Sequence, residues 1–243
     1  MAENGNMSLK RTNKENILDL YDINLRGSIW SGLESLGFSK KSKTTFYRVE
    51  NNFLQIISFN RSWTKNQFNV DLIVHFVDLP VLFEEELIFT NKPRKGCGHI
   101  FSRLMTNDDY KKNLNDHVWV IPENELAARK KFKEVLDCIK NNGLVWLDRV
   151  SDFREIKRIY ETEKDKLLTK YQVGVWADLI GAISYEMLGN KKKAFSVYKP
   201  IYDSDYIKNL GRGVKKFIHS KLKQKYTGKE VTSHPYNSNK SSL

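Results

Sequence analysis

The sequence predicts an α+β protein, with an antiparallel sheet of about four to five strands flanked by helices, followed by a helical C-terminal part. Two patterns indicate this class. Between about residues 44 and 76, apolar and polar side chains alternate with a period of two, which is typical of half-buried strands. After Pro122 the apolar residues recur every three or four positions, as in helices packed on a core. Strands grouped before helices are the arrangement of the α+β class.

The first half is expected to hold one helix followed by strands. Apolar residues at helical spacing predict a helix from about Asn13 to Leu36, and Gly37 would end it. The expected strands cover residues 44–50, 53–59, 68–76, 99–104 and 116–121. Asn51 and Asn52 would form a two-residue turn, because asparagine tolerates the positive φ that such a hairpin needs. The short connections make the sheet antiparallel.

The second half is expected to be helical throughout. The expected helices cover residues 124–141, 152–169, 172–188, 191–203 and 205–226. Gly143 and Gly189 would end the first and the third of these helices. Asp152 would cap the start of the second helix, and Pro200 would bend or end the fourth.

These elements are expected to form two packed parts. Residues 13–142 would be the α+β domain, and residues 143–226 a helical part packed on it, since no Ser- and Pro-rich linker separates them. Residues 1–12 and 227–243 are polar and are expected to be flexible tails.

Several short motifs carry a resemblance to a known family. They are, in chain order, Gly37-Phe38, Lys40-Lys41, Phe46-Tyr47-Arg48, Gln55-Ile56-Ile57-Ser58-Phe59-Asn60, Phe68-Asn69-Val70, Arg103 and Asp116-His117-Val118-Trp119. In these motifs the chain resembles the bacterial family of domains of unknown function numbered four-three-zero-four, over about residues 15–150 and most strongly over 33–72. The resemblance implies an α+β domain and brings no reaction, cofactor or substrate with it.

Composition is typical of a basic, soluble globular protein. The 243 residues are 40% apolar and carry a net charge of +12. No apolar run is long enough to span a membrane, and the first residues lack the apolar stretch of a signal peptide. The two cysteines, Cys97 and Cys138, suit a reducing compartment. We therefore expect a cytoplasmic protein, and the sequence leaves its oligomeric state open.

The positive charge is concentrated near the C-terminus, where residues 201–243 hold half of the excess. The candidate surface for an anionic partner consists of Lys208, Arg212, Lys215, Lys216, Lys221, Lys223 and Lys225. Such a stretch would attract an acidic protein surface or nucleic acid. It could equally be a solvated helix face, because lysines far outnumber arginines in this chain and Arg is the better residue for phosphate recognition.

A possible polar groove lies on the expected sheet. If Asn51 and Asn52 form the turn, Arg48 faces Gln55 across the hairpin. The other residues of this candidate groove, which share one face of the third strand, are Asn69, Asp71 and His75. The alternative is that these five side chains form the hydrated side of an antiparallel sheet, which is polar by default.

Motifs for catalysis and metal binding are missing from the sequence. There is neither a GxxxxGK(S/T) phosphate loop nor a GxGxxG loop, and no serine lies in a GxSxG elbow. Cys97 and His99 are the one close Cys/His pair, too few ligands for a structural zinc site. The paired carboxylates Asp108 and Asp109 are expected to be solvated. We therefore expect no cofactor and no metal, and enzymatic activity stays uncertain.

Three hypotheses about function follow. The leading one is a non-catalytic binding or protein-interaction protein, because a basic helical surface occurs without a catalytic constellation. The second is a nucleic-acid-associated protein that uses residues 208–229 as an electrostatic footprint. The third is an enzyme of unrecognised type, which a deep pocket at Arg48, Asp71 and His75 would favour.

Overall fold

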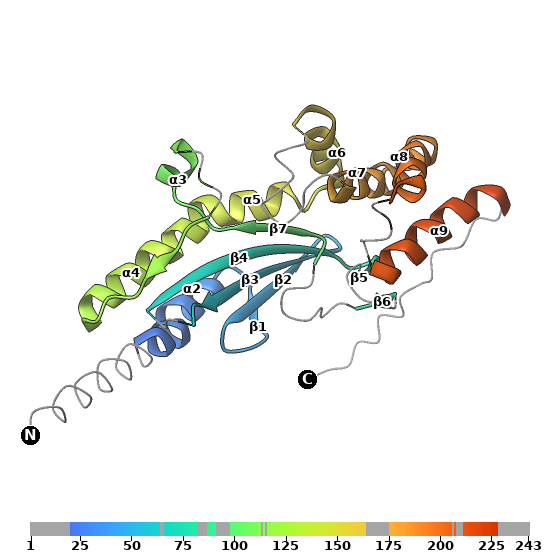
Figure 1. Cartoon of the computed structure of the whole chain (residues 1–243). Helices are drawn as coiled ribbons and strands as arrows, with labels where there is room; N and C mark the ends of the chain where they lie inside the picture. Colours follow the sequence, from blue (N-terminus) through green and yellow to red (C-terminus); the bar gives the residue numbers. More distant parts are fainter. Residues whose placement is uncertain are drawn as a thin grey trace, which may run out of the picture.

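The computed structural model describes most of the chain (Figure 1). The described residues are 20–63, 66–81, 87–90, 98–112, 114, 116–163, 175–205, 207 and 211–227. The expected tails 1–12 and 227–243 therefore lie outside them, apart from Thr227. Cys97, Lys208 and residues 84–86 also lie outside them, and so does the first part of the helix expected from residue 13.

Strands and short helical turns make up the first part of the fold. They are η1 (Leu25–Ile29), α2 (Trp30–Glu34), β1 (Ser39–Lys40), β2 (Thr45–Glu50), β3 (Phe53–Arg61), β4 (Gln67–Phe76), β5 (Pro80–Val81), β6 (Ile88–Phe89), β7 (Ile100–Arg103), α3 (Asn107–Lys111) and β8 (Trp119–Val120). Helices follow: α4 (Glu125–Cys138), η2 (Ile139–Gly143), α5 (Leu144–Arg149), α6 (Phe153–Thr162), α7 (Val175–Met187), α8 (Lys191–Asp203) and α9 (Gly211–Thr227). Both η elements are π-helical turns within longer helices. The α+β class is confirmed.

The central sheet is antiparallel throughout. Within the described residues its strand order is β1-β2-β3-β4-β7, and β8 pairs with β4 beside β7. Asn51 and Asn52 connect β2 to β3 with φ angles of 47° and 65°, which confirms the expected two-residue turn. Gly37 has a φ of 82° after the first helical segment, as the expected C-terminal glycine should.

One face of the sheet, the helix face, packs against η1, α2, α4 and α5. Phe68 of β4 stacks on Phe132 of α4 with ring centroids 5.2 Å apart, and Tyr21 meets both rings edge-on. Trp30 of α2 stacks on Phe46 of β2 at 5.9 Å. These aromatic contacts belong to the hydrophobic core, whose apolar side chains are removed from water.

Residues 125–149 form one continuous helical run, which corrects the expected stop at Gly143. The run passes from α4 through the π-turn η2 into α5, and Gly143 has ordinary helical angles. A Cβ at Gly143 would lie 3.1 Å from Leu104 and 3.5 Å from Leu72, so this glycine allows a helix to approach the sheet closely. The domain boundary expected between residues 142 and 143 falls inside this run.

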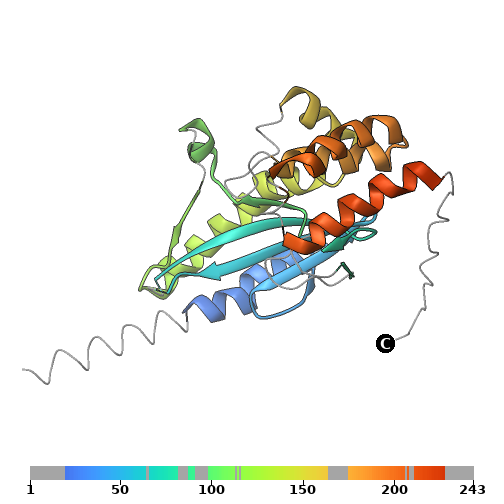
Figure 2. The ribbon, with the colours of Figure 1, turned by 45° about the vertical axis from the view of Figure 1, so that its right-hand side comes forward.

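Helices α6 to α9 pack at one end of the sheet (Figures 1 and 2). Phe153 of α6 lies 4.8 Å from Phe53 and 5.2 Å from Phe76, so one hydrophobic cluster extends from the sheet into this helical part. Gly189 has a φ of 81° between α7 and α8, and α8 continues through Pro200 rather than ending there. Among the described residues no helix combines the length and apolar character that crossing a membrane requires.

The other side of the sheet, the opposite face, is buried at one end and open at the other. Near the end of β4 it carries a small cluster of Leu54, Ile56 and Ile73. The paired strands β5 and β6 also lie near this end of β4. Toward the β3–β4 hairpin the opposite face is polar, and there a pocket opens.

Candidate functional site

The register of the sheet corrects the polar groove expected from the sequence. Arg48 pairs with Gln55, as expected, but Gln55 pairs with Val74 on β4. Paired residues project to the same face and neighbouring residues to opposite faces. Arg48 and Gln55 therefore lie on the helix face, whereas Asn69, Asp71 and His75 lie on the opposite face. The five residues cannot line one groove.

Arg48 and Gln55 form a partly buried polar network with the exposed Asp148 of α5. The Arg48 guanidinium donates to Gln55 Oε1 at 2.7 Å and to Asp148 Oδ1 at 2.6 Å. Gln55 Nε2 donates to Asp148 Oδ1 at 3.1 Å and to Ser151 Oγ at 3.0 Å. The guanidinium also lies over the Phe38 ring, 5.0 Å from its centroid. This network joins β2 and β3 to the end of α5 and satisfies its own polar groups, which is the behaviour of a structural element.

His75 lies in a second environment, against His99 and the β5–β6 pair. The two imidazole rings stack at 4.6 Å, and His99 also stacks on Phe76. Phe76 N–H donates to His99 Nδ1, so the other nitrogen of His99 carries the proton and donates to Pro80 O at 3.0 Å. Burial lowers the pKa of His75, and burial lowers that of His99 to about 3. Both rings are therefore held neutral.

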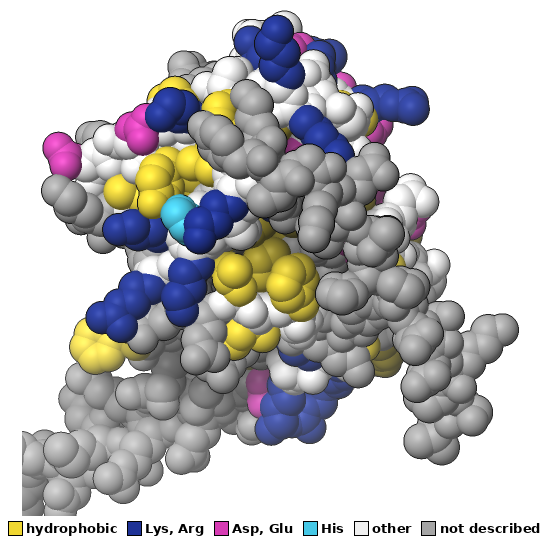
Figure 3. All heavy atoms as spheres, turned by 90° about the vertical axis from the view of Figure 1, so that its right-hand side faces the viewer, with side chains coloured by type: hydrophobic (Ala, Val, Ile, Leu, Met, Phe, Trp, Pro, Cys, Tyr) yellow, Lys and Arg dark blue, Asp and Glu magenta, His cyan; other side chains and the backbone are white. Residues whose placement is uncertain are grey.

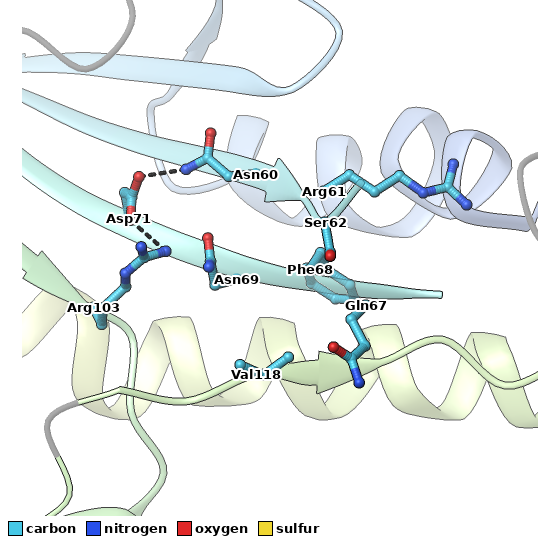
Figure 4. A pocket seen from close by; sticks show the side chains of 9 residues that line it. All are labelled: Asn60, Arg61, Ser62, Gln67, Phe68, Asn69, Asp71, Arg103 and Val118. Carbon is cyan, nitrogen blue, oxygen red and sulfur yellow. Dashed lines mark hydrogen bonds and ion pairs between the residues drawn. The ribbon is translucent and has the colours of Figure 1, made fainter. Parts of the chain in front are cut away.

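Asn69 and Asp71 line a surface pocket of about 330 Å³, which we call the amide pocket (Figure 4). Its lining residues are Asn60, Arg61, Ser62, Gln67, Phe68, Asn69, Asp71, Arg103 and Val118. They come from β3, the residue after it, β4, β7 and the residue before β8. Three of them, Asn60, Gln67 and Asn69, carry primary carboxamides, which give the pocket its name.

The charged groups of the amide pocket are paired with one another. Asp71 accepts a hydrogen bond from Asn60 Nδ2 and forms an ion pair with Arg103, whose Nη1 lies 2.9 Å from Asp71 Oδ1. Arg103 Nε also lies 3.6 Å from Asp116 Oδ1. Figure 4 shows Asn60, Asp71 and Arg103 directed toward one another, while Arg61 points away from them. The Arg61 guanidinium lies over Tyr21, 4.8 Å from the ring centroid.

What we call the pocket rim consists of three exposed apolar residues next to lining residues, or among them: Trp63, Val118 and Val120. Their exposed fractions are 91%, 46% and 52%. Trp63 follows the lining residue Ser62 in the β3–β4 turn, and Val120 pairs with Gln67. Large apolar side chains left in water beside a pocket are typical of binding surfaces.

Sequence reasoning missed Asn60 and Arg103 as pocket residues. Asn60 pairs with Asn69 across the β3–β4 hairpin, a register that the turn length could have indicated. Arg103 pairs with Asp71 from β7, which begins 24 positions after the end of β4, and sequence spacing cannot set that register. The sequence did not indicate that Trp63 is exposed, because a tryptophan in a turn can be either buried or exposed.

Asp109 is buried, which corrects the expectation that the Asp108-Asp109 pair is solvated. Its carboxylate accepts from Thr106 N and Thr106 Oγ1, both at 2.6 Å, in a helix-capping box, and from His117 Nδ1 at 2.8 Å. Burial works against ionisation, but the hydrogen bonds from Thr106 and His117 hold the pKa of Asp109 below its usual value. Burial raises the pKa of nearby Cys138 to about 11, so its thiol is not activated as a nucleophile.

The expected basic surface lies on α9, which has no acidic residue among those described (Figure 3). Arg212, Lys215, Lys216 and Lys223 are exposed. Lys221 is not available in the same way, because its ammonium lies 2.7 Å from Glu186 Oε1. The side chain of Lys225, like the whole of Lys208, lies outside the described residues. No group of three or more His, Cys, Asp or Glu residues within the described chain could hold a metal ion.

The amide pocket and all of the Arg48 network except Ser151 lie within one stretch that a family comparison recognises. Residues 31–149 match the family described as Domain of unknown function (DUF4304). This match confirms the resemblance seen in the sequence. Every residue that lines the amide pocket lies inside the DUF4304 stretch, whereas α9 and its basic residues lie outside it. No curated protein and no solved structure matches the chain.

Proposed function

We propose that this protein is a non-catalytic binding protein whose partner docks at the amide pocket and its rim. The observation that carries the proposal is the internal pairing of Asp71, Arg103 and Asn60 in an open pocket. A catalytic acid, base or nucleophile needs a reactive group directed at a substrate. Here the carboxylate and the guanidinium neutralise each other, so the pocket offers hydrogen bonds and shape.

The pocket rim favours a protein as the partner. Trp63 offers a large apolar surface, and Trp is enriched among the residues that contribute most to binding energy in protein interfaces. Val118 and Val120 extend this surface along the edge of the sheet. A polar centre within an apolar rim can exclude water around a few directed hydrogen bonds.

Affinity capture with matched variants tests this proposal. The native protein, a double variant Trp63→Ala with Val120→Thr, and a control Val145→Thr are used as baits, each with and without nuclease. Val145 is a fitting control because it is 62% exposed on α5, outside the rim and the pocket lining. We expect a protein that survives nuclease, is lost with the double variant and is retained with the control. Capture of the same protein by the double variant and by the native protein would contradict the proposal.

A nucleic-acid-associated function is the second candidate, and the exposed bases of α9 favour it. Arg212, Lys215, Lys216 and Lys223 present positive charge to solvent without an acidic residue on the described helix. Such a surface binds phosphates through charge and not through sequence. In the capture experiment this function predicts an association that nuclease abolishes and that the rim substitutions leave intact.

A further inference from the structure

We propose that the amide pocket recognises an uncharged amide group of a polypeptide partner, either a backbone peptide unit or an Asn or Gln side chain. The inference rests on the proposed function and names the chemistry of the partner at that site. It follows from an unpartnered acceptor, the residue types of the lining, the balance of charge and the apolar edge.

The first observation is an acceptor that has no donor. Asn69 Oδ1 is buried and makes no hydrogen bond in the part of the chain that the structure describes. Buried polar atoms of folded proteins are nearly always paired, because an unpaired one loses its hydration without replacement. In Figure 4 the Asn69 side chain projects among the other lining residues. A ligand N–H that displaces the neighbouring side chains covering Asn69 Oδ1 would satisfy it.

The second observation is the set of carboxamides on neighbouring strands. Asn60 and Asn69 are cross-strand partners on the opposite face, and Gln67 precedes Asn69 by two positions on the same face. A primary carboxamide has both an acceptor oxygen and two N–H donors. Another amide is its natural complement, since each partner can donate one hydrogen bond and accept another.

The third observation is the charge balance, which disfavours a charged ligand. Asp71 is bonded to Asn60 and Arg103, and Arg103 lies between Asp71 and Asp116. Arg61 is turned toward Tyr21. A carboxylate, phosphate, ammonium or guanidinium group entering the pocket would lose water without meeting an uncompensated opposite charge. An uncharged amide loses much less hydration.

The fourth observation is the apolar edge, which suits the aliphatic part of a polypeptide. Val118 lines the pocket and Val120 continues the rim on β8, so the aliphatic part of a peptide could pack there while its amide reaches Asn69. A volume of about 330 Å³ accommodates a short peptide fragment. Trp63 of the rim offers a flat surface on which a base could stack, so adenosine is the comparison probe that tests a nucleobase ligand.

Side-chain NMR signals give a direct test. The NH₂ groups of Asn60, Gln67 and Asn69 are observed in ¹⁵N-labelled protein while N-acetylalanine N-methylamide and N-acetylglutamine N-methylamide are added. Acetate, guanidinium, inorganic phosphate and adenosine are the comparison probes. We expect saturable shifts of these side-chain signals with the two amides alone, with a Kd of about 1 mM or weaker for so small a contact.

Two pocket variants and one control complete the experiment. Asn69→Ala should weaken amide binding about tenfold or abolish it, the scale of a lost hydrogen bond in a binding site. Gln67→Ala, on the same strand, should also weaken binding and serves if Asn69→Ala does not fold. Asn141→Ala removes an exposed carboxamide of η2 and should leave binding unchanged.

The outcomes separate this inference from the proposed function. Larger shifts with adenosine or with a charged probe than with the amides would overturn the amide assignment. The absence of shifts with every probe would overturn it as well. If a protein is captured in a rim-dependent way but the amide probes cause no shifts, the proposed binding function is supported and the amide assignment is wrong. Amide binding without any rim-dependent capture would instead contradict the proposed function.

Discussion

At the scale of single residues, buried polar side chains tie distant parts of this fold together. Gln55 has no exposed surface, yet it contacts β2 through Arg48 and α5 through Asp148, and it also reaches Ser151. If the amide were removed, Arg48 and Asp148 would keep each other but lose one partner each, and Ser151 Oγ would lose its donor. A buried hydrogen-bonding group with several partners is costly to lose.

Substituting Gln55→Leu should therefore destabilise the protein. The leucine has a similar volume but leaves Arg48 and Asp148 with fewer partners, and we expect the free energy of unfolding to fall by about 2 kcal/mol. Urea unfolding followed by tryptophan fluorescence measures this change. Glu50→Gln, an exposed change in the same sheet, is the control and should leave the midpoint unaltered. Equal midpoints for the two variants would show that the network contributes nothing to stability.

The same residues show what a sequence can and cannot predict at this scale. The Arg48–Gln55 pair was predictable, because a two-residue turn fixes the register of the strands that it joins. The partner Asp148 lies 93 residues beyond Gln55 in the chain, and only the packing of α5 brings it close. The prediction of one polar groove was wrong for a related reason. The sequence of β3 does not reveal which of its two faces packs against the helices.

At the scale of elements, two histidines hold the β5–β6 pair against the end of β4. His99 donates to the carbonyl of Pro80, and His75 Nε2 donates to the carbonyl of Thr90 at 2.8 Å. Protonating His99 would break the bond from Phe76 N–H to Nδ1 and would place a charge beside His75 in a buried site. Burial lowers the pKa of His75, and the positive charge of Lys41 lowers it further.

This arrangement predicts that stability falls with acidification. Burial lowers the pKa of His99 from 6.5 to about 3 in the folded protein, so between these values the unfolded chain binds the extra proton. The free energy of unfolding should therefore rise with pH in this window and decrease as the pH falls from 6.5 toward 3. His99 should contribute a slope of about 1.4 kcal/mol per pH unit.

Unfolding measured by urea at several pH values checks this slope. His99→Gln keeps a polar side chain that does not titrate, so the slope should be shallower than in the native protein. His219→Gln changes an exposed histidine of α9 and should keep the native slope. A native slope in the His99 variant would mean that other groups account for the acid sensitivity.

Elements with a regular apolar period were predictable, whereas their ends followed tertiary packing. The strands β2, β3 and β4 lie close to the expected runs because alternation reports one buried face. Gly143 was expected to end a helix, since glycine is the usual residue there. Instead it lies within the helical run, where a Cβ would come within 3.1 Å of the Leu104 side chain and 3.5 Å of the Leu72 side chain. Sequence alone does not show that approach.

At the scale of the whole molecule, the pocket and the basic residues belong to different parts of the fold. The amide pocket lies at the β3–β4 hairpin within the DUF4304 stretch, and its charges are paired. The exposed bases lie on α9, which packs against α8 in the helical part. A net charge of +12 is therefore a poor guide to the chemistry of the pocket. The net charge does predict that the protein as a whole binds to a polyanion.

We expect α9 to dominate adsorption to a polyanion such as heparin. Clustered charges act together within a screening distance of about 8 Å at physiological salt, so a compact set contributes more than dispersed lysines do. A triple variant Lys215→Ala, Lys216→Ala and Lys223→Ala should elute from a heparin column at lower salt than the native protein. Lys221 is left in place, because losing its ion pair with Glu186 would disturb the contact between α7 and α9.

The matched control removes three exposed lysines of the α4–η2 helix, Lys130, Lys133 and Lys140, and gives the same net charge. If the position of the charge decides, this control should elute close to the native protein and well after the α9 variant. Equal elution of the two variants would mean that net charge alone governs adsorption. In that case α9 is a solvated helix face, and the nucleic-acid function loses the observation that favours it.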